Sequence, residues 1–270
     1  LRSDLVVDAL YGIGFKGRFN EFESRIIRMV NTADIPVVAV DIPSGVDADT
    51  GKVHSEAIKA TNTVTFALPK LGLVLQPGKE FVGRLMVADI TIPQALLTDN
   101  RLKTNLIDED FISPLIGKRS PEAHKGTYGH ALVIGGSLGL TGAVMMASNA
   151  ALRSGAGLVT TAVPESLLDI VEGGFLEVMS LPLAETDRRT IALEAIPAIR
   201  NLLGTVSVCA IGPGMSAAPE TNAIVRFVLE ESGVPVVIDA DGINAIKGDI
   251  AILKDRQVPV VLTPHPGEMA

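Results

Sequence analysis

Short apolar runs alternate with amphipathic segments along most of this 270-residue chain. Apolar runs bounded by glycine, proline or aspartate are typical of buried β-strands, whereas apolar residues that recur once per helical turn indicate a helix. Glu21–Thr32 shows the helical spacing, and further helices are expected at Glu165–Glu172, Arg188–Leu203 and Glu220–Glu231. The strand-like runs are Leu5–Leu10, Pro36–Val40, Ala131–Gly135, Leu158–Val163, Ser207–Ile211, Val234–Asp239 and Val258–Leu262.

The alternation of these runs with helices predicts the fold class. A strand, a helix and a second strand form a unit in which the two strands are parallel, and strands that are apolar throughout are covered on both faces. Val178–Leu183 fits either a strand or a loop, and Pro197 predicts a kink in the helix that contains it. We therefore expect an α/β protein with two successive, doubly wound and mostly parallel sheets.

Ala131–Leu152 contains no charged residue, which also suggests a transmembrane segment. Four glycines between residues 135 and 142, together with the polar residues Thr141, Ser148 and Asn149, are unfavourable in a bilayer. We interpret the stretch as a buried strand, a glycine-rich turn and a buried helix, whose first free N–H groups would face an anion.

The chain changes character between Ile92 and Lys118, where proline, glycine and charged residues interrupt the apolar runs. Asp108–Ile116 is expected to form a brief helix with Asp108 near its N-cap. We place a domain boundary near residue 105, which divides the chain into residues 1–105 and 106–270.

The composition restricts the possible partners and the cellular setting. The 23 basic and 31 acidic residues give a net charge of −8, which argues against a nucleic-acid binder but not against a phosphorylated small molecule. The single cysteine, Cys209, lies in an apolar run, which favours its interpretation as a small core residue. One cysteine cannot form an internal disulfide framework, which favours a reduced, cytoplasmic setting. The chain begins without methionine, and we expect the parent protein to be longer.

Carboxylates follow the first two predicted strands. Asp8 and Asp41 lie at carboxyl ends of parallel strands, where open α/β sheets bind their ligands. In Asp41–Asp47, two carboxylates, the Ser44 hydroxyl and backbone carbonyls are hard oxygen ligands suited to Na⁺, K⁺, Ca²⁺ or Mg²⁺, and not to zinc. The alternative is that Asp41 and Ser44 only form turns and caps, and the spacing leaves both open.

A glycine-rich loop follows the first predicted strand. Residues 12–17 match the G-x-G-x-x-G form of dinucleotide-binding sites, which raises an NAD-dependent dehydrogenase as an alternative. Arg18–Asn20 separate these glycines from the helix, so the glycines are expected to form a loop and not the first helical turn.

Special residues also end three strands of the second half. Gly212–Gly214 forms a turn with accessible backbone, and Asp239 and Asp241 follow the next strand. His265 lies between two prolines at the end of the last strand, where we expect ligand contact. For the two aspartates, helix capping and ligand contact are both open.

Motifs in the first half resemble the YjeF N-terminal family, the NAD(P)H-hydrate epimerases. They are LVVDALYGIGFKG (residues 5–17), VDIPSGVD (40–47), ATNTVTF (60–66), Lys70 and RLMVADITIP (84–93). The resemblance implies that Asp8 and Ser44 bind K⁺, that Asp41 contacts the substrate, and that the substrate is lined by Gly12, Ile13, Gly14, Phe15, Lys16, Gly17 and Arg18. Asp41 is then the candidate base for proton transfer at the hydroxylated ring carbon, and Lys16 a charge partner for the dinucleotide phosphates.

Motifs in the second half resemble the ribokinase-like YjeF C-terminal family, the ADP/ATP-dependent NAD(P)H-hydrate dehydratases. They lie at residues 124–129, 135–137, 141–143, 153–157, 211–214 and 263–268. The resemblance implies that Ala143, Gly212, Gly214 and His265 contact the hydrated dinucleotide. The phosphate loop of the first family and the G-x-G-D catalytic motif of the second do not occur in this chain. We therefore expect both domains to be incomplete, and this chain alone to be inactive as a dehydratase.

The order of the two resemblances is that of a fused repair enzyme acting on NAD(P)H hydrate. It implies epimerisation of the hydrate, phosphorylation of its hydroxyl by ADP or ATP with Mg²⁺, and elimination of phosphate. K⁺ is the expected cofactor of the epimerase half, and a homo-oligomer without nucleic-acid or membrane partners is expected. The alternatives are a small-molecule kinase of the ribokinase or hydroxyethylthiazole-kinase type, a dehydrogenase, and a non-enzymatic ligand-binding module.

Overall fold

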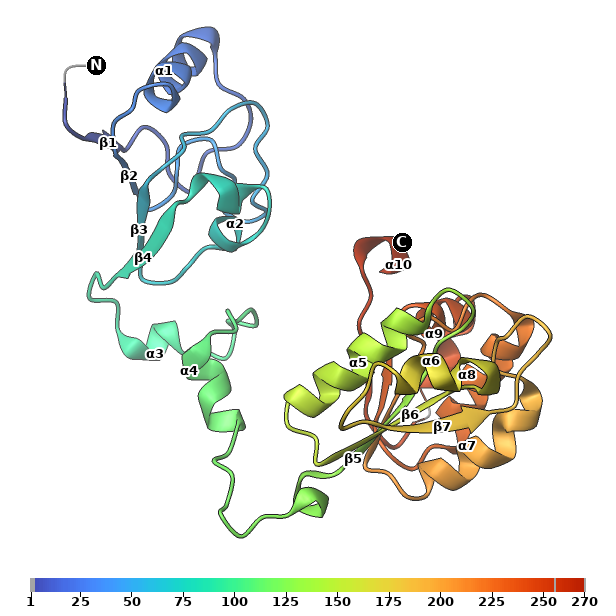
Figure 1. The fold of residues 1–270 in the computed structure, drawn as a ribbon. Helices are drawn as coiled ribbons and strands as arrows, with labels where there is room; N and C mark the ends of the chain where they lie inside the picture. The colour runs from blue at the N-terminus through green and yellow to red at the C-terminus, as the bar shows by residue number, and fades with distance from the viewer. Residues whose placement is uncertain (1–2, 255, 270) are drawn as a thin grey trace. The chain divides into compact units, whose positions relative to one another are not determined.

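The computed structural model of the protein describes residues 3–254 and 256–269. The contacts divide the chain into two compact units, Leu1–Ile116 and Gly117–Ala270, coloured blue to green and green to red in Figure 1. This division lies later in the chain than the boundary expected near residue 105.

The first unit contains a four-stranded parallel sheet in the order β1-β2-β3-β4. The parallel pairing of its first two strands through a helix confirms the predicted strand–helix–strand unit. The strands are β1 (Val6–Asp8), β2 (Val37–Val40), β3 (Asn62–Phe66) and β4 (Arg84–Ala88). The helices are α1 (Glu21–Asn31), α2 (Leu71–Val74), α3 (Gln94–Leu97) and α4 (Glu109–Ile112), with 3₁₀ turns η1 (Gly78–Phe81) and η2 (Ser113–Leu115).

Side-chain caps mark where two helices of the first unit, α1 and α4, begin. A capping box starts α1, because the Asn20 side chain accepts from the Glu23 amide at 2.9 Å and the Glu23 carboxylate accepts from the Asn20 amide at 2.8 Å. The Asp108 side chain accepts from the Phe111 amide at 2.9 Å, which confirms it as the N-cap of α4. Ile27 of α1 is fully buried in the cluster that also contains Val37 of β2.

The second unit contains a six-stranded parallel sheet in the order β10-β9-β8-β5-β6-β7. The segment that fitted a strand or a loop forms the edge strand β7. The strands are β5 (His130–Ile134), β6 (Leu158–Pro164), β7 (Met179–Leu183), β8 (Val208–Ile211), β9 (Val236–Ile238) and β10 (Val260–Leu262). The helices are α5 (Thr141–Arg153), α6 (Leu168–Glu172), α7 (Ile196–Leu203), α8 (Pro219–Glu231), α9 (Asp241–Ala245) and α10 (Pro266–Met269), with 3₁₀ turns η3 (Lys125–Tyr128), η4 (Glu165–Leu167), η5 (Leu193–Ala195) and η6 (Ile250–Leu253).

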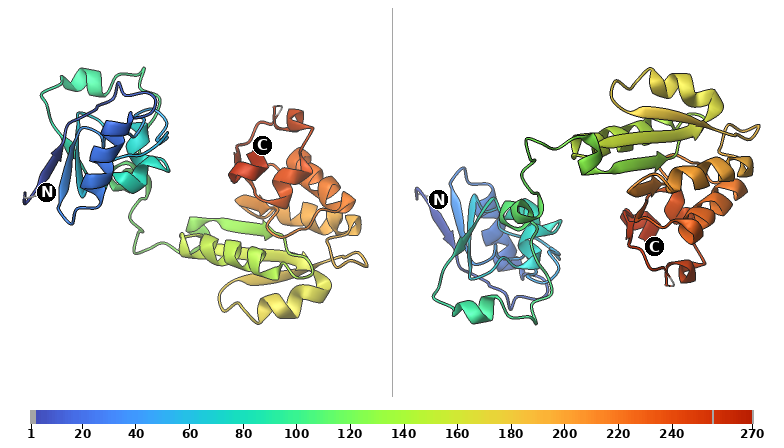
Figure 2. Two further views of the ribbon diagram at one scale, coloured as in Figure 1. Left: turned by 90° about the horizontal axis from the view of Figure 1, so that it is seen from above. Right: turned by 90° about the horizontal axis from the view of Figure 1, so that it is seen from below.

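Helices cover both faces of the six-stranded sheet. Along β5, Leu132 and Ile134 join the core cluster formed with α7 and α8, whereas Ala131 and Val133 join the cluster formed with α5 and α6. The views in Figure 2 show the two helical layers on either side of the strands. This alternation is the doubly wound arrangement expected from strands that are apolar throughout.

Two sequence-based expectations are decided in this unit. The uncharged stretch 131–152 forms β5, a turn and most of α5, and no helix within the described residues is both long and apolar enough to cross a bilayer. The prediction of a kink at Pro197 is wrong. Pro197 lies in the first turn of α7, where a backbone N–H would make no hydrogen bond within the helix. Residues 188–192, expected to belong to the same helix, are not helical.

Candidate active site

Asp8 and Ser44 form a buried oxygen cluster at the carboxyl end of β1. Asp8 is only 3% exposed, and its two oxygens accept from the Ser44 amide at 2.8 Å and the Ser44 hydroxyl at 2.6 Å. The Tyr11 carbonyl oxygen lies 3.3 Å from the same hydroxyl. No lysine or arginine in the part of the chain that the structure describes forms an ion pair with Asp8. A buried carboxylate beside hydroxyl and carbonyl oxygens is a donor set that fits a hard cation such as K⁺.

Asp41 lies at the end of β2 and is paired with Lys70. Its Oδ1 accepts from the Lys70 ammonium, from the Phe66 amide at 2.9 Å and from the Thr65 hydroxyl at 3.0 Å. Burial alone would raise the pKa of Asp41, but the hydrogen bonds from these donors outweigh it and hold the pKa below its ordinary value. The sequence leaves a cation or ligand site and a turn open for Asp41. The structure adds a feature that neither interpretation includes, an ionised carboxylate paired with a lysine.

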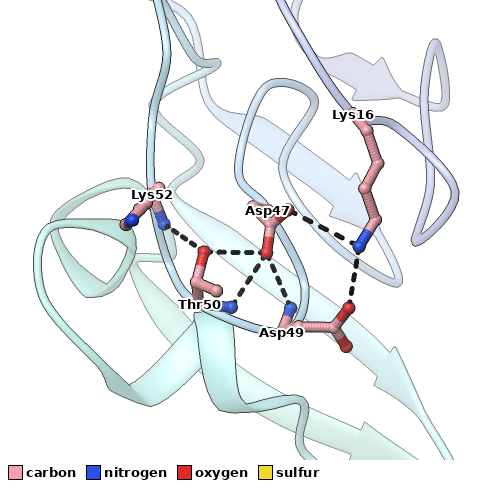
Figure 3. Close-up of polar contacts among 5 residues, drawn as sticks. All are labelled: Lys16, Asp47, Asp49, Thr50 and Lys52. Atoms are coloured by element: carbon pink, nitrogen blue, oxygen red, sulfur yellow. Dashed lines mark hydrogen bonds and ion pairs between the residues drawn. The ribbon is translucent and has the colours of Figure 1, made fainter.

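Asp47 forms a turn, a role that the sequence interpretation gives to Asp41 and Ser44 and not to this residue. Its Oδ1 accepts from the Asp49 amide at 3.0 Å, the Thr50 amide at 2.9 Å and the Thr50 hydroxyl at 2.8 Å (Figure 3). These three bonds occupy one carboxylate oxygen and close the loop after β2.

The Lys16 side chain lies against this loop. Figure 3 shows its Nζ between Asp49 Oδ2, at 3.0 Å, and Asp47 Oδ2, at 4.0 Å. The hydrogen bond to Asp49 is the main cause that raises the pKa of Lys16. Its expected role as a phosphate partner stays a prediction, and a phosphate would have to compete with two carboxylates.

The glycine-rich loop of residues 12–18 precedes α1 instead of forming its first turn, because the helix begins at Glu21. This disfavours the dehydrogenase alternative, in which the helix N-terminus faces the pyrophosphate. The Phe15 ring packs on Tyr11 and Phe19, with centroid distances of 4.8 Å and 4.6 Å. A Cβ added at Gly12, Gly14 or Gly17 would meet no atom within 4 Å, so these glycines border open space.

In the second unit, three predicted contact residues lie together at the carboxyl edge of the sheet. Gly212, with φ 122°, lies so close to the end of β9 that an added Cβ would be 1.9 Å from the Asp239 carbonyl oxygen. A Cβ at Gly214 would be 3.2 Å from the Cβ of Ala143, in the first turn of α5. The turn after β8 therefore packs against the end of β9 and the first turn of α5 at positions that have no side chain.

Asp239 and Asp241 tie adjacent loops together. Asp239 Oδ1 accepts from the Thr263 hydroxyl at 2.7 Å, and Asp241 Oδ2 accepts from the Ser216 amide at 2.8 Å. Helix α9 has Ala240 at its N-cap position and no side-chain capping bond. The capping interpretation of these aspartates is therefore wrong, because their carboxylates reach neighbouring loops instead of the free amides of their own helix.

His265 follows β10 and is exposed. Its Nδ1 accepts from the Gly267 amide at 3.0 Å, and its Nε2 lies 3.4 Å from Glu268 Oε1. Thr263, two residues earlier, bonds to Asp239 and so links this loop to the edge that carries the Gly212–Gly214 turn. The structure records no direct bond between His265 and Ala143, Gly212 or Gly214 within residues 3–254 and 256–269.

Comparison with known families agrees with this geometry. The family profile described as NAD(P)H-hydrate dehydratase matches residues 131–270, and the profile described as YjeF-related protein N-terminus matches residues 2–72. The chain belongs to the NAD(P)H-hydrate dehydratase family. Both resemblances read from the motifs are thereby confirmed.

Individual relatives contain the two segments in the same order. The chain is 46% identical to the bifunctional NAD(P)H-hydrate repair enzyme Nnr of Moorella thermoacetica, over 100% of this chain and 51% of that protein. It is 37% identical to the enzyme of the same name from Thermofilum pendens, over 99% and 50%. A crystal structure of a hypothetical protein from Streptococcus mutans has 25% identity and a TM-score of 0.50, over 61% of this chain and 56% of that one. The chain thus spans about half the length of the curated relatives it matches.

The structure of this family member also adds residues that the pattern of the sequence did not single out. Lys70 is named only through the resemblance. The sequence pattern does not single out four other residues individually, namely Thr65, Tyr11, Ser216 and Thr263. A signal was present for Thr65, because in a strand read as Asn-Thr-Val-Thr-Phe alternate hydroxyls point to the same face, and this face is buried.

Proposed function

We propose that this chain belongs to a protein that repairs hydrated NADH and NADPH. The first unit would interconvert the two epimers of the hydrate, and the second would take part in its ADP- or ATP-dependent dehydration. The order of the two family segments, which is also found in relatives named bifunctional repair enzymes, supports this proposal.

The observation that carries the epimerase proposal is the set of groups at two neighbouring strand ends. The cluster of Asp8 and Ser44 would hold K⁺, whose charge offsets the buried carboxylate. Asp41 would contact the ligand with its Oδ2, for which no hydrogen bond is recorded among the described residues. There it would move a proton at the hydroxylated ring carbon. The open space beside Gly12, Gly14 and Gly17 would admit the ligand to the backbone.

In the second unit, the turn formed by Gly212–Gly214 would receive the hydrated ring, with Ala143 and His265 beside it. The missing side chains at Gly212 and Gly214 let the neighbouring backbone close against this turn. The turn lies at the carboxyl edge of a parallel sheet, which is where such folds bind ligands. Transfer of a phosphoryl group from ADP or ATP to the hydroxyl would convert hydroxide into phosphate, a better leaving group. Mg²⁺ would accompany the nucleotide, and no residue of this chain is assigned to it.

The setting that we propose is a reduced cytoplasm, with the protein as a homo-oligomer and NAD(P)H hydrate as its small-molecule partner. Support for a reduced setting comes from cysteine usage, because Cys209 is the single cysteine of the sequence and is free. Its side chain is fully buried. Burial raises the pKa of its thiol to about 12, so that it stays protonated and unreactive.

The test is to follow the epimers of hydrated NADH by chromatography. A sample enriched in one epimer should return to the equilibrium mixture faster with this chain in KCl than in buffer or NaCl. The Asp41→Asn variant should lose this acceleration, whereas Asp34→Asn, which changes an exposed carboxylate, should keep it. A rate equal to that of buffer, or equal rates in Asp41→Asn and wild type, would refute the epimerase proposal.

A further inference from the structure

Asp41 has a backbone conformation that a non-glycine residue rarely adopts. Its φ is 68°, and the Ile42 amide donates to the Val40 carbonyl across it at 2.8 Å, forming a γ-turn at the end of β2. The Asp41 amide still donates to Val64 of β3 at 2.8 Å. The strand therefore ends in a sharp turn that directs the Asp41 side chain along the end of β3. Strained turns of this kind persist where surrounding contacts fix them, and they are concentrated at functional sites.

The two oxygens of the Asp41 carboxylate have different surroundings. Oδ1 accepts three hydrogen bonds, from Thr65, Phe66 and Lys70. Oδ2 has no recorded partner among the described residues and is not among their buried, unpartnered atoms, so solvent or a ligand can reach it. One oxygen is anchored and the other is available.

Lys70 has no donor left for a ligand. Its ammonium contacts Asp41 Oδ1, the Thr65 hydroxyl at 2.9 Å and the Phe66 carbonyl at 3.0 Å. An ammonium has three N–H donors, and these three acceptors use all of them. The side chains of Lys70 and Asp41 are 21% and 18% exposed, so their attraction is screened less than that of a surface pair. Lys70 therefore acts on Asp41 and not on a bound molecule.

We propose that Lys70 is a positioning residue for the epimerase reaction, which anchors Asp41 Oδ1, keeps the carboxylate ionised and leaves Oδ2 as the atom that meets the hydroxylated ring of the substrate. This inference rests on the proposed function for the identity of the substrate. The coupling between Lys70 and Asp41 can be measured without any substrate, so the two proposals fail separately.

The first experiment measures the titration of Asp41 directly. In carboxyl-labelled protein, the ¹³C signal of Asp41, assigned by its loss in Asp41→Asn, should titrate below the ordinary aspartate pKa of 3.8 in wild type. In Lys70→Met the midpoint should rise above the wild-type value, and Lys70→Arg should restore part of the shift because it keeps the charge. The matched control is Lys59→Met, an exposed lysine without a recorded ion pair, which should leave the midpoint unchanged. An unchanged midpoint in Lys70→Met would overturn the proposal.

The second experiment separates positioning from folding. If epimerase turnover is measured, Lys70→Met should lower kcat by about tenfold or more and move the acidic limb of the pH profile upward, with a smaller effect on KM. A purely structural role would lower the amount of active protein and leave the pH limb in place, and that result would refute positioning. If Lys70→Met does not fold, Thr65→Val, which removes one hydrogen bond to Oδ1, should raise the Asp41 midpoint by a smaller amount, and no change there would refute the proposal. If wild type shows no epimerase turnover, the proposed function fails while the titration still decides the role of Lys70.

Discussion

Gly212 is a position where the second unit depends on the absence of a side chain. Its φ of 122° lies in the region that favours glycine, and an added Cβ would be 1.9 Å from the Asp239 carbonyl oxygen and 2.7 Å from the Gly242 amide nitrogen. Both neighbours are backbone atoms, one directly after β9 and the other in the first turn of α9, so no side-chain rotation relieves the overlap. We therefore predict that Gly212→Ala strongly destabilises the second unit.

The magnitude has two parts. Holding alanine at an unfavourable backbone conformation costs about 1–3 kcal/mol. Moving the ends of β8 and β9 apart to admit a methyl group costs about another 1–3 kcal/mol, as overpacking does elsewhere in protein cores. A combined loss of about 4 kcal/mol in the free energy of unfolding corresponds to a fall in Tm of about 8–16 °C for a unit of this size.

The matched control is Gly248→Ala. Gly248 also has a positive φ, 90°, but its added Cβ would meet no atom within 4 Å, so this variant should show the conformational cost alone. Differential scanning calorimetry of both variants and wild type measures the two terms, and the transition of the first unit should not move. If Gly212→Ala lowers Tm no more than Gly248→Ala does, the argument from backbone crowding is wrong.

Four further predictions follow from the two units. Ala143→Leu should weaken binding of hydrated NADH by about tenfold in calorimetric titration, because a larger side chain fills the space beside the turn after β8, and unchanged affinity would make that turn purely structural. Cys209 should not react with a thiol reagent at pH 8 until the chain unfolds, because its thiol pKa is raised to about 12. The folded pKa of Asp41 lies below its ordinary value of 3.8, so its pairing with Lys70 should stabilise the first unit fully above that pH. This stabilisation is lost as the pH falls through the folded pKa, and the difference in Tm between wild type and Lys70→Met should shrink accordingly. Ala240→Gly should raise the free energy of unfolding of the second unit by about 1 kcal/mol, and with it the Tm. The reason is that Ala240 has φ 47° and ψ −116°, a conformation that glycine adopts more easily than alanine.

The sequence predicts most of the parallel strands because buried strands consist of continuous runs of apolar residues. The apolar runs around β2, β5 and β8 are covered on both faces or packed in a core, and only apolar residues satisfy that environment. β3 is different, since it reads Asn-Thr-Val-Thr-Phe, and its apolar pattern predicts no strand. Its Thr63 is fully buried but donates to the Val82 carbonyl at 2.7 Å, so a satisfied hydroxyl replaces an apolar group there.

The sequence also predicts which residues stand at the strand ends, but not which partners they take. For Asp41 the spacing leaves a cation or ligand site and a turn open. The backbone at Asp41 does turn, but the pairing of its carboxylate with Lys70, 29 residues later, does not follow from the spacing. For Asp239 and Asp241 the sequence leaves helix capping and ligand contact open, whereas in the structure they accept from Thr263 and Ser216 of neighbouring loops. These partners depend on the path of long connections, which residue spacing does not determine.

Both units concentrate unfavourable backbone conformations at the carboxyl ends of their strands. Asp41 and Ala67 have φ of 68° and 62° in the first unit, and Ser216 and Ala240 have φ of 68° and 47° in the second. Such conformations lower stability, so they persist only where hydrogen bonds hold them, as Lys70 holds Asp41 and as Asp241 holds the Ser216 amide. Sharp turns at these ends bring amides and carboxylates to the edge of the sheet instead of continuing the strand. The stability given up at these few positions is therefore what exposes the polar groups that a ligand at this edge would meet.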